Sequence, residues 1–167
     1  MQLLIDNSFL TDDQKITLED IFESGVVPFN YTPDAAYDGD NGVHFIHHVV
    51  RGEKSFSPLF DFFKGVLDSF TKNNNIAYNV IHRIAINITF NNGQLYKCPV
   101  HKDHNFDHKQ LILYLNDSSG DTMIETDSGD YIPVMPEKYK GVCFNNVNHY
   151  HYYPVTGIRR IAVFTFS

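Results

Sequence analysis

The second half of this chain reads as a series of short strands separated by frequent turns. From Tyr78 to Phe90, apolar residues alternate with polar ones at the period of two that a half-buried strand requires. A strong turn signal follows at Asn91-Asn92-Gly93, and later turns recur about every eight to twelve residues. The strands predicted after it are a segment that begins at Tyr96, then 111–116, 122–125, 131–134, 141–144, 149–151 and 161–166. This succession predicts a β-sandwich or barrel.

Two helices are predicted ahead of these strands. Thr11 and Gln14 fit the N-cap and N3 positions of a capping box, and the first helix is expected to stop at Gly25. Ser57 is the expected N-cap of a second helix that ends near Asn75. Its apolar residues recur at spacings of three and four: Leu59, Phe62, Phe63, Val66, Leu67 and Phe70. We interpret this stripe as a face that packs on a sheet rather than as a cofactor site.

The other N-terminal segments are less regular. Residues 2–6 are predicted to form a short edge strand. Residues 26–44 are interrupted by proline and glycine, so they form loops that either close over a substrate or simply connect elements on the surface. A strand at 43–50 contains three histidines without the spacing of a later ligand pair, and none is expected to bind metal: His44, His47 and His48.

Composition narrows the class of protein. A length of 167 residues with 43% apolar residues suits one folded domain that spans 1–167. The net charge of −7, with no basic run beyond Arg159-Arg160, offers no stripe for a phosphate backbone, so nucleic acid is not expected as a partner. Cys98 and Cys143 are predicted to be reduced thiols. With no signal peptide and no apolar run of membrane-spanning length, we expect a soluble, cytoplasmic protein that does not bind membranes, located in the host cytoplasm if it is viral.

The tripeptide His101-Lys102-Asp103 is the first candidate for chemistry. In an extended strand, His101 and Asp103 project to the same face, which places an imidazole beside a carboxylate. These are two of the three ligands of a 2-His-1-carboxylate triad, which holds Fe(II) with cis positions left open. A His-x-Asp match alone is weak, because chance gives roughly one in a chain of this composition. The second histidine of the triad is available about fifty residues later, at His149 or His151.

The order of His-x-Asp, strands, a distal histidine and then an arginine resembles that of the 2-oxoglutarate/Fe(II)-dependent dioxygenases. The likeness is strongest to the prolyl 4-hydroxylase branch, including small forms of the kind that phages encode. It covers most of residues 78–167 and the N-terminal opening at 3–11. The landmarks that carry it are Tyr96, Tyr114-Leu115-Asn116, Gly120-Asp121, Pro136, Phe144 and Pro154-Val155-Thr156-Gly157-Ile158-Arg159. No single landmark is specific, but together they are.

The resemblance implies a fold, a reaction and a set of roles. The fold would be α+β and mainly β, a double-stranded β-helix (jelly roll) with N-terminal helices on one sheet. The enzyme would use Fe(II), 2-oxoglutarate and O2, with ascorbate as a candidate auxiliary reductant, to hydroxylate a C–H bond and release succinate and CO2. The best guess for the substrate is a prolyl residue of a peptide or protein, and a small molecule stays open. Tyr114, Tyr96 and one of Arg159 and Arg160 would bind the cosubstrate, since a guanidinium suits its far carboxylate.

Two choices stay open at the level of sequence. His149 and His151 lie on the same face of a strand, so parity does not decide between them as the third ligand after His101 and Asp103. We favour His149, because its ten-residue distance to Arg159 matches the usual count of the resembled branch. For the arginine, the spacing from Gly157 favours Arg159, whereas the apolar alternation that follows favours Arg160.

Three other functions compete with the dioxygenase. The His149-Tyr150-His151 pair also resembles cupins, although the glutamate expected after it is missing. A zinc site from His101, His104 and His108 would need a helix or a tight loop, and no thiolate accompanies it. The third alternative is a non-catalytic jelly-roll module that binds a ligand or serves a structural role.

Overall fold

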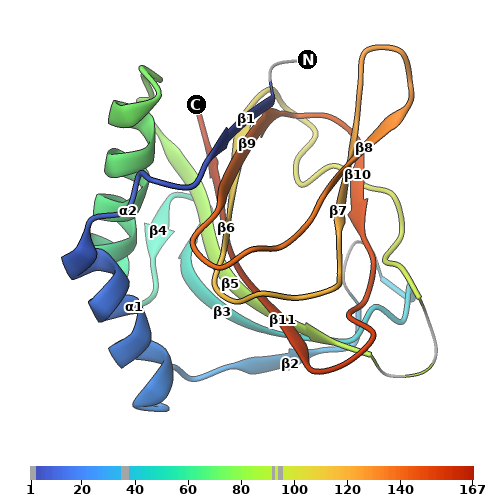
Figure 1. Ribbon diagram of the computed structural model, residues 1–167, viewed down its shortest axis with the longest axis horizontal. Helices are drawn as coiled ribbons and strands as arrows, with labels where there is room; N and C mark the ends of the chain where they lie inside the picture. Colours follow the sequence, from blue (N-terminus) through green and yellow to red (C-terminus); the bar gives the residue numbers. More distant parts are fainter. Residues whose placement is uncertain (1–2, 35–37, 92, 94–95) are drawn as a thin grey trace.

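Two antiparallel sheets face each other, and two helices cover the outer side of the larger one (Figure 1). The computed structural model describes residues 3–34, 38–91, 93 and 96–167. The larger sheet has eight strands, seven of which follow the order β1 (Leu3–Asp6), β9 (Gly141–Asn145), β6 (Lys109–Tyr114), β11 (Ile158–Phe166), β5 (Ile81–Phe90), β3 (His44–Arg51) and β2 (Asn30–Thr32). The eighth, β4 (Lys54–Ser55), pairs with β3. The smaller sheet has the order β10 (His149–His151), β7 (Thr122–Glu125) and β8 (Tyr131–Val134).

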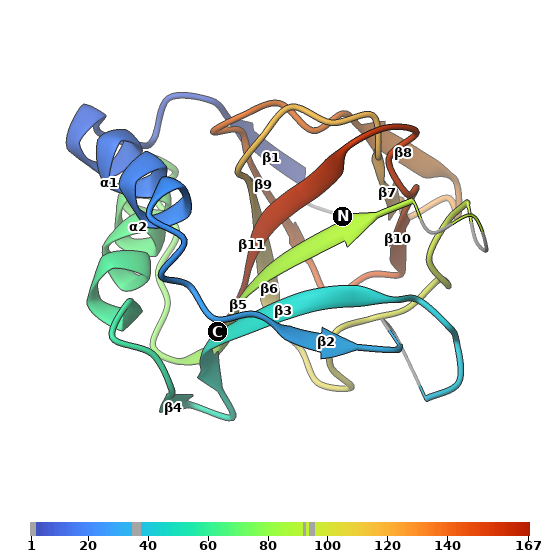
Figure 2. The same cartoon turned by 90° about the horizontal axis from the view of Figure 1, so that it is seen from below.

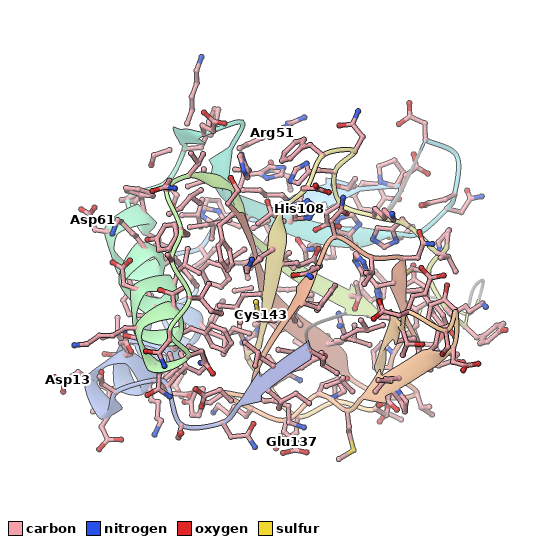
Figure 3. All side chains as sticks on the ribbon, turned by 90° about the horizontal axis from the view of Figure 1, so that it is seen from above. Asp13, Arg51, Asp61, His108, Glu137 and Cys143 are labelled. Atoms are coloured by element: carbon pink, nitrogen blue, oxygen red, sulfur yellow. The ribbon has the colours of Figure 1, made fainter. Side chains whose placement is uncertain are left out.

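The interior has two main layers, one on each face of the larger sheet. The side chains of strand β11 alternate between these two layers. Ala162 and Phe164 contribute to the cluster beneath the helices, whereas Ile161 and Val163 contribute to the cluster shared with the smaller sheet. Cys143, labelled in Figure 3, belongs to the helix-side cluster. Both cysteines are buried and free, as the sequence predicts.

The first helix, α1 (Asp12–Glu23), confirms the predicted capping box. The Thr11 hydroxyl accepts the backbone N–H of Gln14 at 3.2 Å, and the Gln14 side chain accepts the backbone N–H of Thr11 at 3.0 Å. The helix ends at Glu23, and its C-cap Ser24 is followed by Gly25, whose φ of +65° favours glycine.

The second helix, α2 (Phe60–Asn73), begins later than predicted. The hydroxyl of Ser57 accepts the backbone N–H of Leu59, but the turn it closes precedes the helix, so the prediction of Ser57 as N-cap is wrong. The Ser57 hydroxyl is also bonded to the His47 ring at 2.9 Å, which ties it to β3. The apolar stripe packs as expected, with Phe63, Val66, Leu67 and Phe70 all fully buried.

Most of the strand predictions are confirmed with shifted ends, but the strand predicted to begin at Tyr96 is replaced by isolated bridges at Lys97 and His101. Strand β5 begins at Ile81 rather than Tyr78, and β11 begins at Ile158, three residues earlier than predicted. The predicted loop at 26–44 contains the short strand β2, which extends the larger sheet beside β3 (Figure 2). Within the described residues, no helix is both long enough and apolar enough to cross a membrane.

Gly141 allows β9 to approach α2 closely, and this contact gives a test of the packing. A Cβ at Gly141 would lie 2.6 Å from the Phe9 ring and 2.9 Å from the Phe70 ring. We expect Gly141→Ala to lower the free energy of unfolding by about 1–3 kcal/mol, because the buried rings have to shift. Gly65→Ala is the matched control, since a Cβ there has nothing within 4 Å and should stabilise α2 by about 0.5–1 kcal/mol. Urea unfolding checks both, and equal stability of the two variants would refute the close contact.

Candidate metal centre

The side chains of the His101-Lys102-Asp103 motif meet a histidine that is distant in sequence, His149. One ligand atom from each of His101, Asp103 and His149 lies within 4.8 Å of the other two. Asp103 Oδ1 is 3.6 Å from Nε2 of His101 and 3.6 Å from Nε2 of His149. Among the residues described, no other group of three or more His, Cys, Asp or Glu side chains has this geometry. Two imidazoles and one carboxylate form the donor set of a facial triad.

A backbone bridge holds the two histidines together. The N–H of His101 donates to the carbonyl of His149 at 3.0 Å, and the N–H of His149 donates to the carbonyl of His101 at 2.9 Å. The expectation that His101 and Asp103 lie in a regular strand is wrong. Isolated bridges pair Lys97 with Tyr152 and His101 with His149. The segment 97–101 is therefore one residue longer than the segment 149–152 that it faces, which indicates a bulge in 97–101. Asp103 lies in a bend beyond the bridge.

Each histidine is bonded so that its Nε2 faces the carboxylate. Nδ1–H of His101 can donate to the carbonyl of Pro99 at 2.8 Å, and Nδ1–H of His149 to the carbonyl of Val147 at 3.2 Å. A neutral imidazole that donates from Nδ1 keeps a lone pair on Nε2, which is the form that binds a metal. The backbone therefore prepares both rings as ligands.

The electrostatics keep the carboxylate charged. Asp103 is 7% exposed, and its Oδ2 accepts from a guanidinium nitrogen of Arg83 on β5 at 3.2 Å. Burial by itself raises the pKa of Asp103, but Arg83, with the two imidazoles, outweighs it and lowers the pKa. Burial also lowers the pKa of His149 to about 4, against a partial opposing effect of Asp103. At neutral pH the site thus presents a carboxylate and a neutral His149.

The triad opens into a cavity of about 600 Å³, including the part that is open to solvent. Strand β5 lines it with Arg83, Asn87 and Thr89, and β6 contributes Gln110, whose amide nitrogen is 3.3 Å from Nε2 of His149. The period-two pattern of β5 could have identified Asn87 and Thr89, because they share its polar face.

Arg159 lies inside the cavity and Arg160 lies outside it. Arg159 is 1% exposed, donates from Nε to the carbonyl of Gly120 at 2.9 Å and from Nη2 to Thr122 at 2.7 Å. Its Nη1 is buried without a partner among the described residues. Arg160 projects to the opposite face, where its guanidinium lies 4.6 Å from the ring centroid of Phe22 in α1. Arg159, which the spacing from Gly157 favours, is therefore the arginine that faces the cavity, and its binding of the cosubstrate stays a prediction.

The two predicted cosubstrate tyrosines occupy different places. Tyr114 is fully buried beneath Arg159, and its hydroxyl donates to Thr122 at 2.6 Å, so Thr122 rather than Tyr114 lines the cavity. Tyr96 is 71% exposed and stacks on Tyr152 at a centroid distance of 5.9 Å. A direct role for either tyrosine in cosubstrate binding stays a prediction, and this geometry favours an indirect role for Tyr114.

Three other histidines near the site, His151, His44 and His104, lie outside the group of three ligands. His151 lines the cavity but does not belong to the triad, and its Nδ1 is bonded to Cys98. His44 on β3 also lines the cavity, but it lies outside the group of three ligands, as expected from its spacing. The alternative zinc group of His101, His104 and His108 is not formed among the described residues. His104 is bonded instead to Thr165 at 2.9 Å.

The lowered pKa of His149 predicts a pH-dependent stability of the metal-free protein. An unfolded histidine has a pKa near 6.5, so between pH 6.5 and about 4 the unfolded state binds a proton that His149 in the folded state does not. Its contribution is complete above pH 6.5 and is lost as the pH falls toward 4. We expect about 2 kcal/mol of unfolding free energy to be lost through His149 between pH 7 and pH 5. Urea unfolding at both values should show a smaller loss in His149→Gln; an equal loss would contradict the assignment.

Comparisons with known proteins identify the fold. No family model and no curated protein matches the sequence. Among solved structures, an oxidoreductase of the 2OG-Fe(II) oxygenase family from Burkholderia pseudomallei matches with a TM-score of 0.78 at 12% identity, over 99% of this chain and 84% of that one. A Trichoplax adhaerens prolyl hydroxylase, in complex with a hypoxia inducible factor peptide, matches with a TM-score of 0.67 at 14% identity, over 98% of this chain and 82% of that one.

A Pseudomonas putida prolyl-4-hydroxylase matches with a TM-score of 0.65 at 12% identity, over 98% of this chain and 91% of that one. These structures agree with the architecture predicted from sequence, a mainly β core of antiparallel sheets with two helices. This chain has the fold of the 2-oxoglutarate/Fe(II) oxygenases.

Proposed function

We propose that this protein is an Fe(II)- and 2-oxoglutarate-dependent oxygenase, a single domain over residues 1–167 with a double-stranded β-helix core. It would hydroxylate a C–H bond and release succinate and CO2. One observation carries the proposal: His101, Asp103 and His149 converge at a cavity into which a buried Arg159 also projects. The fold of the three similar structures supports it.

The residues present fit a divalent iron. They provide three protein ligands from one side, and a triad of this kind leaves the remaining coordination positions for other molecules. The Nε2 lone pair of His149 and the ionised Asp103 need no proton removal at neutral pH, so metal binding to these two groups is not opposed by protonation. When bound, iron together with 2-oxoglutarate and O2 supplies the oxidation of an unactivated C–H bond. The protein supplies the three ligand side chains and the cavity beside them.

Arg159 is suited to the far carboxylate of 2-oxoglutarate. Two of its guanidinium nitrogens are held by Gly120 and Thr122, so the group is fixed before a ligand arrives. The third nitrogen, Nη1, is buried without a partner among the described residues. A buried arginine with a free donor is costly unless an anion completes it. A dicarboxylate that reaches both the metal and Arg159 meets that requirement.

Arg83 contacts Asp103 and also lines the cavity. Its bond to Oδ2 orients Asp103 so that Oδ1 faces the two histidines. Because Arg83 is partly exposed at the cavity, it also borders the space for a substrate. A prolyl residue in a peptide is the substrate we propose first, since two of the similar structures are prolyl hydroxylases and one of them is in complex with a peptide.

The metal assignment can be tested by anaerobic titration of the metal-free protein with Fe(II) and 2-oxoglutarate. We expect the charge-transfer absorption of a chelated 2-oxo acid in the wild type and at saturating 2-oxoglutarate in His151→Ala. His149→Ala should lose it, because it removes one of the three ligands. A folded wild type without this absorption would contradict the proposal and leave the non-catalytic module as the leading alternative.

The two neighbouring arginines provide a matched pair for the cosubstrate. We expect Arg159→Met to raise the Kd for 2-oxoglutarate about 100-fold or more, because it removes two charge-assisted hydrogen bonds from a buried site. Arg160→Met should change it less than about threefold, because Arg160 lies against Phe22 on the other face of β11. The charge-transfer absorption measures both constants, and circular dichroism confirms folding. Comparable losses in the two variants would show that Arg159 has no special role.

A further inference from the structure

His151 lines the cavity, yet the metal centre does not use it. Its side chain projects from β10 on the same face as His149, but only His149 belongs to the triad. Its Nε2 is inaccessible and has no partner among the described residues. A polar atom left unpaired inside a cavity is costly, so a ligand that completes it is favoured.

Cys98 holds the other side of the His151 ring. Sγ of Cys98 is 3.1 Å from Nδ1 of His151, and it also accepts the backbone N–H of His151 at 3.1 Å. The backbone N–H of Cys98 in turn donates to the carbonyl of His151 at 2.9 Å. The two residues are thus joined by three contacts, and the ring cannot turn without breaking one of them.

The positions of the hydrogens on Cys98 and His151 decide whether Nε2 of His151 is a donor or an acceptor. Burial raises the pKa of the Cys98 thiol to about 11, so it keeps its hydrogen. A neutral imidazole carries one N–H, on either Nδ1 or Nε2. If the thiol donates to Nδ1 of His151, that N–H is on Nε2. In the reverse arrangement, the thiol hydrogen has no acceptor among the described residues, and Nε2 offers only a lone pair.

Two further donors face the same cavity. Nη1 of Arg159 is unpaired, as described above. The oxygen of Thr122 already accepts from Tyr114 and from Arg159, so the hydrogen of its own hydroxyl is left to be donated. With Nε2–H of His151, the cavity presents three N–H or O–H donors, which suits a carboxylate.

We propose that His151 donates a hydrogen bond from Nε2 to the far carboxylate of 2-oxoglutarate beside Arg159, and that Cys98 is the positioning residue that sets this tautomer. This inference rests on the proposed function. It assigns to His151 the binding of the cosubstrate rather than of the metal, and it gives a role to a buried thiol that packing alone does not require.

Paired substitutions separate this role from metal binding. We expect His151→Leu to raise the Kd for 2-oxoglutarate about tenfold or more, while the Kd for Fe(II), measured without 2-oxoglutarate, changes less than about twofold. His151→Gln places an amide N–H near the position of Nε2 and should recover most of the lost affinity. Cys98→Ala should weaken 2-oxoglutarate binding severalfold. Cys143→Ala, which removes another buried thiol, should leave it unchanged.

The tautomer can be observed directly, without any turnover. Long-range ¹H–¹⁵N correlation spectra of the metal-free protein distinguish an imidazole protonated at Nε2 from one protonated at Nδ1, and the His151→Gln spectrum assigns the signal. We expect the Nε2–H form in the wild type and in Cys143→Ala, and a mixture of both forms in Cys98→Ala. This spectrum tests the proposed tautomer of His151 in the wild type even if His151→Leu does not fold.

The outcomes keep the two proposals apart. A wild type that binds neither Fe(II) nor 2-oxoglutarate overturns the proposed function and this inference with it. A wild type that binds both, with His151→Leu unchanged in 2-oxoglutarate affinity, overturns only the inference. Loss of Fe(II) binding in folded His151→Leu, or an Nδ1–H tautomer in the wild type, also overturns it.

Discussion

The register of β11 fixes which of its side chains face the helices and which face the cavity. The strand is hydrogen-bonded to β5 on one side and to β6 on the other, so its register is held from both edges. One set of its residues packs under the helices, and the other faces the smaller sheet and the cavity. A slip of one residue would move Arg159 into the helix-side core and Arg160 into the cavity. The position of the buried cation is therefore a consequence of sheet register.

The backbone also controls the geometry of the candidate metal centre. The two histidines are joined by a reciprocal pair of backbone hydrogen bonds, and their rings are oriented by carbonyls close to them in sequence. Asp103 comes from a bend, and the Arg83 side chain completes its orientation. Orientation by neighbouring groups of this kind is as important to a metal site as the ligands themselves. The site is thus prepared by the fold before any ligand enters.

Three side chains that line the cavity carry a buried polar atom without a partner among the described residues. Arg159 and His151 each leave a nitrogen unpaired, and Asn87 on β5 leaves its side-chain oxygen unpaired. Gly120 allows Arg159 its place, since a Cβ there would lie 2.4 Å from the carbonyl oxygen of Tyr152 and 3.0 Å from Cδ of Arg159. Unpaired buried groups reduce stability, and a ligand in the cavity that pairs with them would offset that cost.

The sequence by itself determined the element types, the His-x-Asp motif, a pair of candidates for the distal histidine and another pair for the arginine. These follow from local rules: the period-two pattern of strands, the capping box at Thr11 and the spacing of the motif residues. The residue count to Arg159 favoured His149 over His151, but the shared face of β10 did not separate the two, and nothing in the sequence placed Tyr114 behind Thr122. That His149 lies beside His101 and Asp103, and that Thr122 covers the Tyr114 hydroxyl, follows from tertiary structure, because both depend on which strands pair and in what register. Contacts between residues as distant as Asp103 and His149, or Cys98 and His151, arise from that pairing, and no local pattern in the chain encodes it.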